Sequence, residues 1–195
     1  MDDHQITSVP PAVDAILRDT GWMGFTMASE PRTGALLRTL AASRPGGRFL
    51  ELGTGTGFGT AWLLAGMDAQ SRLDTVENDA RVLEVARRHL GHDPRVTFHL
   101  MDGGEFLARA AGQQFDLIYA DTWPGKFTDL DDALALLAVG GIYLIDDLLP
   151  QPSWPAGHAP KVPVLVADLE RRDAFVVTKL AWASGLMIVV RTRAG

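Results

Sequence analysis

Cysteine is absent from the 195 residues of the chain, and no apolar run approaches the ~20 residues that a membrane-spanning helix needs. Without cysteine there is no disulfide, no thiolate nucleophile and no zinc site with cysteine ligands. The first residues, MDDHQITSVPP, are acidic and polar, unlike a signal peptide. We therefore expect a cytoplasmic protein with no membrane partner.

Concentrated positive charge is missing as well. Eighteen Lys and Arg stand against 24 Asp and Glu, which gives a net charge of −6, and the basic residues are scattered along the chain. Nucleic acids and anionic membranes are bound through concentrated positive charge. We therefore expect no nucleic acid as a partner.

Short apolar segments alternate with segments of helical period through most of the chain. Apolar residues make up 47% of the sequence, enough for one good core, and we expect one domain over residues 1–195. Strands are predicted at 48–52, 72–77, 95–100, 115–120 and 141–146. A hairpin follows at 174–182 and 185–193, and its connection is so short that the two strands must be antiparallel. The predicted fold is α/β: a seven-stranded, mostly parallel sheet with a C-terminal antiparallel hairpin and helices on both faces.

Several residues carry helix-start signals. A short helix is expected at 9–18, before an irregular segment. Residues 1–29 as a whole are expected to cover the ligand-binding site. Ser29 is predicted to cap a helix that begins at Glu30, and Asn78 to cap another. Asp102 has the spacing of a capping box, so helix capping is one complete explanation for it.

The stretch ELGTGTGFG, residues 51–59, follows the first strand directly. Glycines at this turn allow positive φ and let a ligand touch the backbone at a helix N-terminus. The dinucleotide pattern G-x-G-x-x-G is absent, since its third position falls on Phe58 or Thr60. Glu51 would repel a pyrophosphate but suits a ligand with an amino group. The loop therefore favours S-adenosylmethionine over a dinucleotide.

Two acids follow the next strands. Glu77 ends the second predicted strand, where a carboxylate can accept both hydrogen bonds of a ribose diol. Asp102 ends the third, where it could face an adenine edge instead of capping a helix. Dinucleotide-binding enzymes also place an acid at the end of the second strand, so Glu77 alone does not distinguish S-adenosylmethionine from a dinucleotide.

Together these motifs resemble the class I S-adenosylmethionine-dependent methyltransferases, and within them the small-molecule O-methyltransferases similar to catechol O-methyltransferase. The resemblance extends from about Met27 to Arg193. It is carried by the segments MASEPRTG, FLELGTGTGFGT, VEND, FDLIYADTWPGKF, VGGIYLIDDLL and SGLMIVVR.

The resemblance implies a Rossmann-like methyltransferase fold and methyl transfer from S-adenosylmethionine to a hydroxyl of a small-molecule acceptor. The implied cofactor-binding residues are Met27, Glu51, Gly53, Thr54, Gly55, Gly57, Glu77, Asn78, Asp102, Gly103, Asp121 and Trp123. For Trp123, a role in covering the strand ends is the alternative. Relatives often form homodimers, so a homodimer is expected.

Metal-dependent members of the family hold a divalent cation, usually Mg²⁺, and the matching positions here are Asp121, Asp146 and Asp147. Such a cation would chelate the acceptor and lower the pKa of its hydroxyl. The family's catalytic lysine corresponds to Pro124, a departure that leaves Asp121 and Lys126 as the catalytic candidates.

Other candidates and other functions remain open. His158 and Lys161 are possible substitutes for the missing lysine. A metal-independent small-molecule methyltransferase, and a protein that binds S-adenosylmethionine with little or no catalysis, are the alternative functions.

Overall fold

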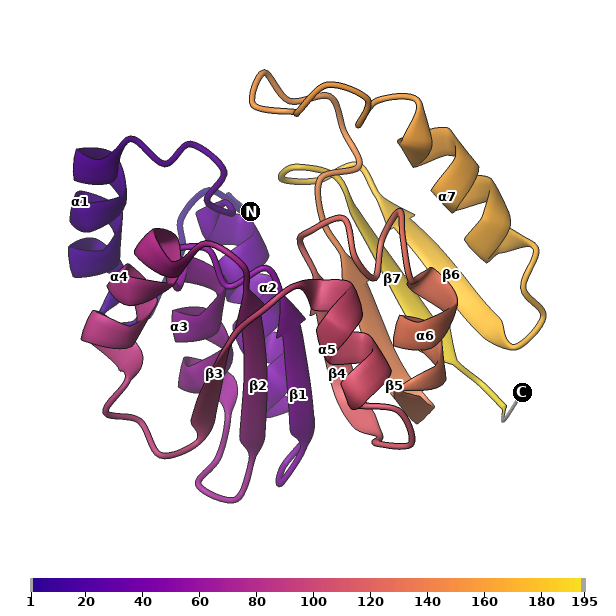
Figure 1. Ribbon diagram of the computed structural model, residues 1–195, viewed down its shortest axis with the longest axis horizontal. Helices are drawn as coiled ribbons and strands as arrows, with labels where there is room; N and C mark the ends of the chain where they lie inside the picture. Colours follow the sequence, from indigo (N-terminus) through magenta and orange to yellow (C-terminus); the bar gives the residue numbers. More distant parts are fainter. Residues whose placement is uncertain (1, 194–195) are drawn as a thin grey trace.

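The computed structural model describes residues 2–193 and contains one sheet with the strand order β3-β2-β1-β4-β5-β7-β6 (Figure 1). The strands are β1 (Arg48–Leu52), β2 (Arg72–Glu77), β3 (Val96–Leu100), β4 (Phe115–Ala120), β5 (Leu137–Ile145), β6 (Phe175–Leu180) and β7 (Leu186–Arg191). The first five pair in parallel, and β7 pairs antiparallel with both β5 and β6. The predicted mixed sheet with a closing hairpin is confirmed.

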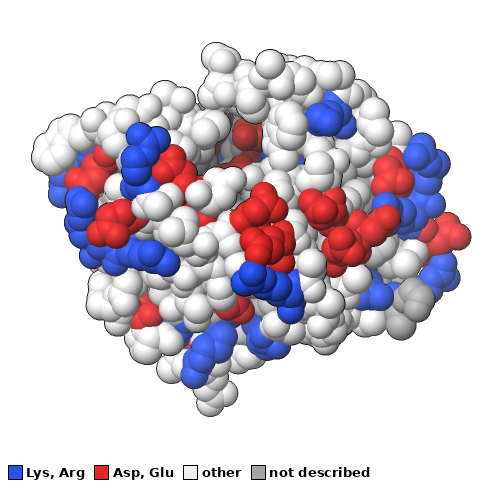
Figure 2. Space-filling view, viewed as in Figure 1, with Lys and Arg blue, Asp and Glu red and all other residues white. Residues whose placement is uncertain are grey.

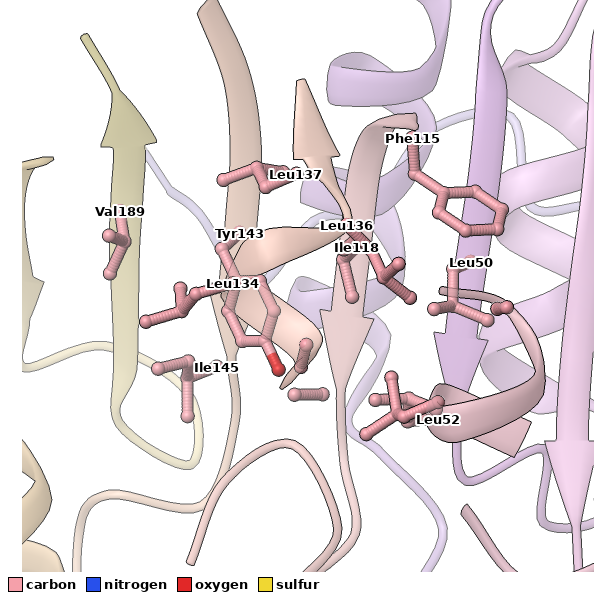
Figure 3. Packing of buried hydrophobic residues seen from close by; sticks show 14 of the residues in the cluster. Leu50, Leu52, Phe115, Ile118, Leu134, Leu136, Leu137, Tyr143, Ile145 and Val189 are labelled. Atoms are coloured by element: carbon pink, nitrogen blue, oxygen red, sulfur yellow. The ribbon is translucent and has the colours of Figure 1, made fainter. Parts of the chain in front are cut away.

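Helices cover both faces of the sheet, as predicted. They are α1 (Val13–Met23), α2 (Pro31–Ala42), α3 (Phe58–Gly66), α4 (Ala80–Leu90), α5 (Gly103–Arg109), α6 (Leu130–Ala135) and α7 (Lys161–Glu170). Residues of α1, α2 and α3 pack on one face, around Trp62 and Tyr119. On the other face, residues of α5, α6 and α7 enclose Phe115, Ile118 and Tyr143 (Figure 3). Because both faces are covered, the central strands β1 and β4 are mainly apolar and almost wholly buried.

The first helix begins and ends later than the sequence predicts, and the second begins one residue later. The predicted helix 9–18 is observed as α1, which ends at Gly24 in the left-handed conformation (φ 71°). Ser29 does not cap α2. Instead Glu30, in an extended conformation, precedes Pro31 at the first helical position, and no side chain caps this end. Proline lacks an amide hydrogen, so one of the four free donors at this helix start is already absent.

Two further cap predictions have different outcomes. Asp79, not Asn78, caps α4, because its carboxylate accepts a hydrogen bond from Arg81 N at 2.8 Å. Asp102 caps α5 as predicted and accepts from Gly104 N at 2.8 Å and Glu105 N at 3.2 Å.

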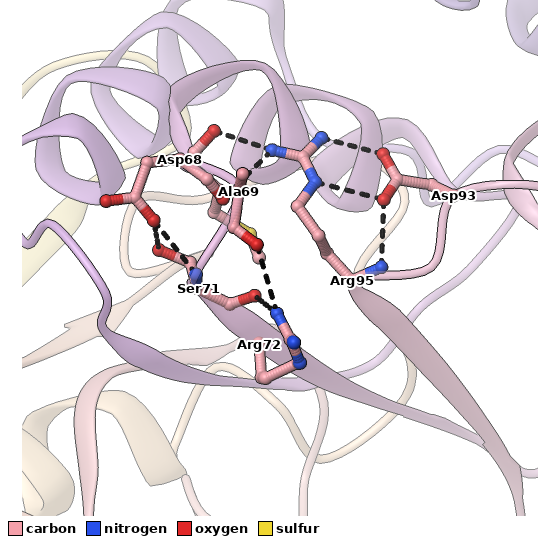
Figure 4. Close-up of polar contacts among 7 residues, drawn as sticks. Asp68, Ala69, Ser71, Arg72, Asp93 and Arg95 are labelled. Atoms are coloured by element: carbon pink, nitrogen blue, oxygen red, sulfur yellow. Dashed lines mark hydrogen bonds and ion pairs between the residues drawn. The ribbon is translucent and has the colours of Figure 1, made fainter.

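Side-chain hydrogen bonds join the loops at the amino ends of β2 and β3 (Figure 4). Asp68 accepts from Ser71 N at 2.9 Å, and Arg95 donates to Asp93 and to the carbonyl of Met67. These contacts fix the edge of the sheet that lies opposite the glycine loop. Across residues 2–193, the helices are all too short or too polar to cross a membrane.

Candidate active site

A cavity of about 650 Å³ opens at the carboxyl edge of the sheet, between the loops that follow β1, β2 and β4. Here the chain order reverses between neighbouring strands β1 and β4, the position at which open α/β sheets bind ligands. The segment from Met23 to Ser29 closes one side. Seven of the predicted site residues line the cavity: Met27, Gly53, Thr54, Gly55, Glu77, Asn78 and Asp121.

The glycine loop forms the floor of this cavity, and its glycines are required by geometry. Gly53 has φ 100°, and a Cβ there would lie 2.9 Å from the carbonyl oxygen of Asp121. Gly57 has φ 93°, and a Cβ there would lie 2.8 Å from the Cβ of Ala86. The loop then enters α3 at Phe58, which lines the cavity, so the amino end of the helix points toward a bound ligand.

Glu77 fastens this loop to the end of β2. Its carboxylate accepts hydrogen bonds from Gly55 N (2.9 Å), Asn78 N (2.9 Å) and Asp79 N (3.0 Å). A carboxylate has about four acceptor positions, so these three bonds leave one for a ligand. Glu77 therefore organises the cavity wall and still offers an acceptor to a hydroxyl.

Glu51 lies behind the cavity, in contrast to its predicted place beside the ligand. Its side chain is fully buried and accepts hydrogen bonds from Thr60 and from Thr75, the latter at 2.6 Å. Burial raises the pKa of this carboxyl to about 7, and the nearby charge of Glu77 adds to the effect. Glu51 therefore connects β1, β2 and α3 and does not line the cavity.

Four other predicted cofactor residues also lie outside the cavity lining: Gly57, which packs against Ala86, and Asp102, Gly103 and Trp123. The exposed Asp102 carboxylate turns back to the amides of α5, and Gly103 lies against Pro124. The Trp123 ring packs edge-on against Phe127, with centroids 5.9 Å apart. The structure thus brings together the glycine loop, Glu77 and Asp121, but not Asp102, Gly103 or Trp123.

A second cavity of about 160 Å³ adjoins the first, and the two share Met27, Ala28, Ser29 and Asp121. Its lining is largely polar: Thr26, Ser29, Glu30, Asp121, Asp146, Asp147, Gln151, Ser153 and Ser184 line it together with Met27 and Ala28. Acidic side chains show at the bottom of a hollow on the upper edge of the molecule (Figure 2). Two adjoining cavities of unequal size suit a large cofactor and a small acceptor.

The carboxylates of the smaller cavity are held by donors from several elements. Asp121 accepts from Ser29 Oγ at 2.9 Å, and the Tyr119 hydroxyl lies 3.2 Å from the same oxygen. Asp146 accepts from Tyr119 at 2.6 Å, from Asp147 N at 2.7 Å and from the Ser184 hydroxyl. Burial, and then the charge of Asp146, raise the pKa of Asp121 well above its ordinary value and also raise that of Asp147.

The predicted metal site is not assembled by these residues. Within the described range 2–193, no three His, Asp or Glu side chains are arranged to hold a metal ion. The reason lies in the donors around Asp146: one of its carboxylate oxygens faces Tyr119, and the other faces Ser184 and the Asp147 amide. The side chains of Asp121, Asp146 and Asp147 meet around one cavity, as predicted, but the geometry does not fit Mg²⁺.

Lys126 is buried, with 2% of its surface exposed, and lines neither cavity. Its Nζ donates to the carbonyl oxygen of Asp146 at 3.0 Å. His158, a predicted substitute, donates from Nε2 to the carbonyl of Asp147 at 3.0 Å and stacks on Trp154. Lys161 lies over the ring of Trp123. These side chains stabilise the loops around the smaller cavity, and none of them lines it.

Three residues around the smaller cavity are not predicted from the sequence as site residues: Ser29, Tyr119 and Ser184. The position of Ser29 before a predicted helix indicates a helix cap. Tyr119 carried a usable signal, because it is a polar aromatic in an apolar strand and lies two residues before Asp121, on the same side of the chain. Ser184 had none, since a serine in a tight hairpin is ordinary turn chemistry.

Comparisons with known proteins agree with this geometry. A family model described as a methyltransferase domain matches residues 50–148. A relative from Mycobacterium tuberculosis (strain H37Rv), named "Probable O-methyltransferase Rv1220c", is 34% identical over 124 residues, which is 60% of this chain. The chain spans about half (55%) of that relative's length.

Two solved structures are similar in fold. One is the O-methyltransferase TomG from Streptomyces achromogenes in complex with SAM, with a TM-score of 0.84 and 20% identity over 98% of this chain and 94% of that one. The other is an O-methyltransferase from Bacillus cereus in complex with SAH, with a TM-score of 0.84 and 18% identity over 97% and 94%.

Proposed function

Because the chain belongs to the methyltransferase domain family, we propose that it transfers the methyl group of S-adenosylmethionine to a hydroxyl oxygen of a small acceptor. The observation that carries the proposal is the pair of adjoining cavities, which share Ser29 and Asp121. A cofactor in the larger cavity and an acceptor in the smaller one would meet at this shared wall.

The larger cavity supplies the features that a nucleoside with an amino acid tail needs. Glu77 would accept a hydrogen bond from the ribose, and the glycine loop would lie against the ligand without side chains in the way. Met27 would cover the reacting group from the side of the N-terminal segment. The solved relatives in complex with SAM and SAH support the choice of this cofactor.

Asp121 is the proposed general base. It lies where the two cavities meet, and because its pKa is raised, its ionised form is a stronger base than that of an ordinary aspartate. The acceptor hydroxyl would give its proton to Asp121 as its oxygen bonds to the methyl carbon. S-adenosylmethionine, when bound, would supply that methyl group, with the electron pair of the broken carbon–sulfur bond kept by the leaving S-adenosylhomocysteine. Most of the rate would come from alignment and from this proton transfer.

Calorimetric titration with S-adenosylmethionine and S-adenosylhomocysteine tests the cofactor assignment. We expect wild type to bind both and Glu77→Ala to bind at least about tenfold more weakly, because it loses a charged acceptor and the anchor of the glycine loop. Glu84→Ala, an exposed acid on α4, is the matched control and should bind like wild type. Failure of wild type to bind either compound would contradict the proposal. Binding with no turnover of any acceptor would favour a protein that binds S-adenosylmethionine without catalysis.

We further propose that the chain acts in the cytoplasm on free small molecules and not on nucleic acid. Lys and Arg are interspersed with Asp and Glu on the face shown in Figure 2, which supports the proposal that the chain does not act on nucleic acid. A homodimer stays a prediction from the family resemblance.

A further inference from the structure

We propose that Tyr119 is a positioning residue whose hydroxyl holds Asp121 and Asp146 together in the acceptor cavity. It would do so by hydrogen bonds, a task that the family resemblance gives to a divalent cation. The activity part of this inference rests on the proposed function, whereas its metal-binding part does not.

The Tyr119 hydroxyl is the point at which three side chains meet. Its oxygen lies 2.6 Å from Asp146 Oδ2, 3.2 Å from Asp121 Oδ2 and 3.0 Å from Ser29 Oγ. The tyrosine is fully buried, and its ring packs among the apolar residues beneath α2 and α3, so the hydroxyl has little freedom to move. A phenol has one proton to donate, and a carboxylate can only accept, so the two carboxylates share this proton. The shorter contact marks Asp146 as the main acceptor and Asp121 as the weaker one.

The two carboxylates rely on hydroxyl and amide donors, because no basic side chain forms an ion pair with them, and Tyr119 is the donor that they share. In the described part of the chain, no ion pair joins Lys, Arg or His to Asp121, Asp146 or Asp147. The nearby Lys126 donates to the main-chain carbonyl of Asp146 and not to a carboxylate. Buried carboxylates without donors are costly, and hydrogen bonds to them are among the strong ones.

A cation would have to compete with bonds that the chain already makes. Asp146 accepts from Tyr119, Ser184 and the Asp147 amide, so both of its oxygens are engaged. Mg²⁺ requires a near-octahedral set of oxygen ligands and gives up its waters reluctantly. The hydroxyls of Tyr119 and Ser184 therefore favour a metal-independent site, in which the chain itself keeps the acids in place.

Titration with MgCl₂ and MnCl₂ in the absence of any cofactor tests the metal part. We expect no saturable binding to wild type at millimolar concentrations. Saturable binding in Tyr119→Phe would support the proposal, because that variant leaves the two carboxylates without their shared donor. The matched control is Tyr143→Phe, which removes the other tyrosine hydroxyl, a donor to the carbonyl of Gly125 on the opposite face of the sheet. Saturable binding to wild type that disappears in Asp146→Asn would overturn the proposal.

Steady-state kinetics test the positioning part. In Tyr119→Phe we expect kcat to fall about ten- to a hundredfold, the range for a lost hydrogen bond to a charged group, with KM for S-adenosylmethionine unchanged. Added Mg²⁺ should restore part of this kcat and leave wild type unaffected, a rescue that a purely structural role would not give. Tyr143→Phe should keep the wild-type kcat.

Wild-type kcat in Tyr119→Phe would overturn the proposal. Should Tyr119→Phe fail to fold, Ser184→Ala removes a different donor from Asp146 and is expected to lower kcat in the same direction. If the protein does not bind S-adenosylmethionine, the proposed function is wrong. The metal titration would still test the inference about Tyr119, because it needs no cofactor.

Discussion

Ser29 Oγ donates a hydrogen bond to Asp121 Oδ2 at 2.9 Å, although the two residues lie 92 positions apart in the chain. The bond ties the segment that precedes α2 to the end of β4. Both residues line both cavities, so this contact forms part of the wall between the proposed cofactor and acceptor sites. A hydroxyl at this position orients the proposed base without adding charge.

Ser29→Ala should lower kcat about tenfold, because Asp121 loses a donor that fixes its orientation. The affinity for S-adenosylmethionine should change little, since within residues 2–193 the Ser29 hydroxyl bonds to Tyr119 and Asp121 and not to the glycine loop or Glu77. Steady-state kinetics and calorimetry measure the two quantities separately. Ser43→Ala, which removes an exposed hydroxyl that donates to the carbonyl of Leu40, is the control. Equal kcat values for Ser29→Ala and wild type would remove Ser29 from the site.

Gly57→Ala should destabilise the protein more than Gly112→Ala. Both glycines have positive φ, 93° and 85°, which costs an alanine about 1–2 kcal/mol. Only Gly57 is crowded: its new Cβ would lie 2.8 Å from that of Ala86, whereas the space around Gly112 is open. Crowding adds about 1–3 kcal/mol. Urea denaturation of the two variants compares these costs directly, and equal losses would show that the loop can move away from α4.

The fold and the glycine-rich wall of the larger cavity could be predicted because main-chain requirements leave a mark on the sequence. Positive φ requires glycine at Gly53 and Gly57, and Glu77 is the last residue of β2. These features depend on local geometry, and so a pattern of residue types is enough to find them.

The lining of the smaller cavity could not be predicted in the same way, because it depends on the directions in which side chains point. Lys126 is close to the acids in sequence and space, but its amine turns to a main-chain carbonyl. Trp123 packs on Phe127 instead of on the cavity. Ser29 looked like a cap, and only tertiary packing brings it to Asp121. None of these outcomes follows from spacing alone.

Glu51 should make the stability of the protein depend on pH. Its pKa is about 7 in the folded chain against 4.5 ordinarily, so the folded state holds the proton more tightly than the unfolded state. The contribution of Glu51 to stability is therefore fully present below pH 4.5 and is lost as the pH rises to about 7, a change of about 3 kcal/mol.

Urea unfolding of wild type and Glu51→Gln at pH values from 5 to 8 isolates this effect. The free energy of unfolding of wild type should fall relative to that of Glu51→Gln over this range, because glutamine does not titrate. Glu84→Gln, at an exposed position, should run parallel to wild type. If the free energy of unfolding of Glu51→Gln had the same pH dependence as that of wild type, the Glu51 carboxyl would ionise without cost, and burial would not control its pKa.

The smaller cavity should select acceptors by charge. Four carboxylates line it, those of Glu30, Asp121, Asp146 and Asp147, and no Lys or Arg is among its lining residues. Like charges a few ångströms apart repel by several kcal/mol where water is partly excluded. An acceptor with an ammonium group should therefore be methylated at least about tenfold more efficiently than one with a carboxylate.

Ethanolamine, ethylene glycol and glycolate form a matched set, because each is a two-carbon hydroxyl compound and they differ mainly in charge. Formation of S-adenosylhomocysteine with each compound gives the ratios of kcat/KM. We expect kcat/KM to be highest for ethanolamine, lower for ethylene glycol and lowest for glycolate. In Glu30→Gln these three values should differ less, because the variant removes a carboxylate that lines the cavity but does not bond to Tyr119. The spread should also narrow at high salt, since Glu30 is partly exposed to solvent. Preference for glycolate would place the acceptor elsewhere, because an anion cannot enter this acidic cavity without a cation that the lining does not provide.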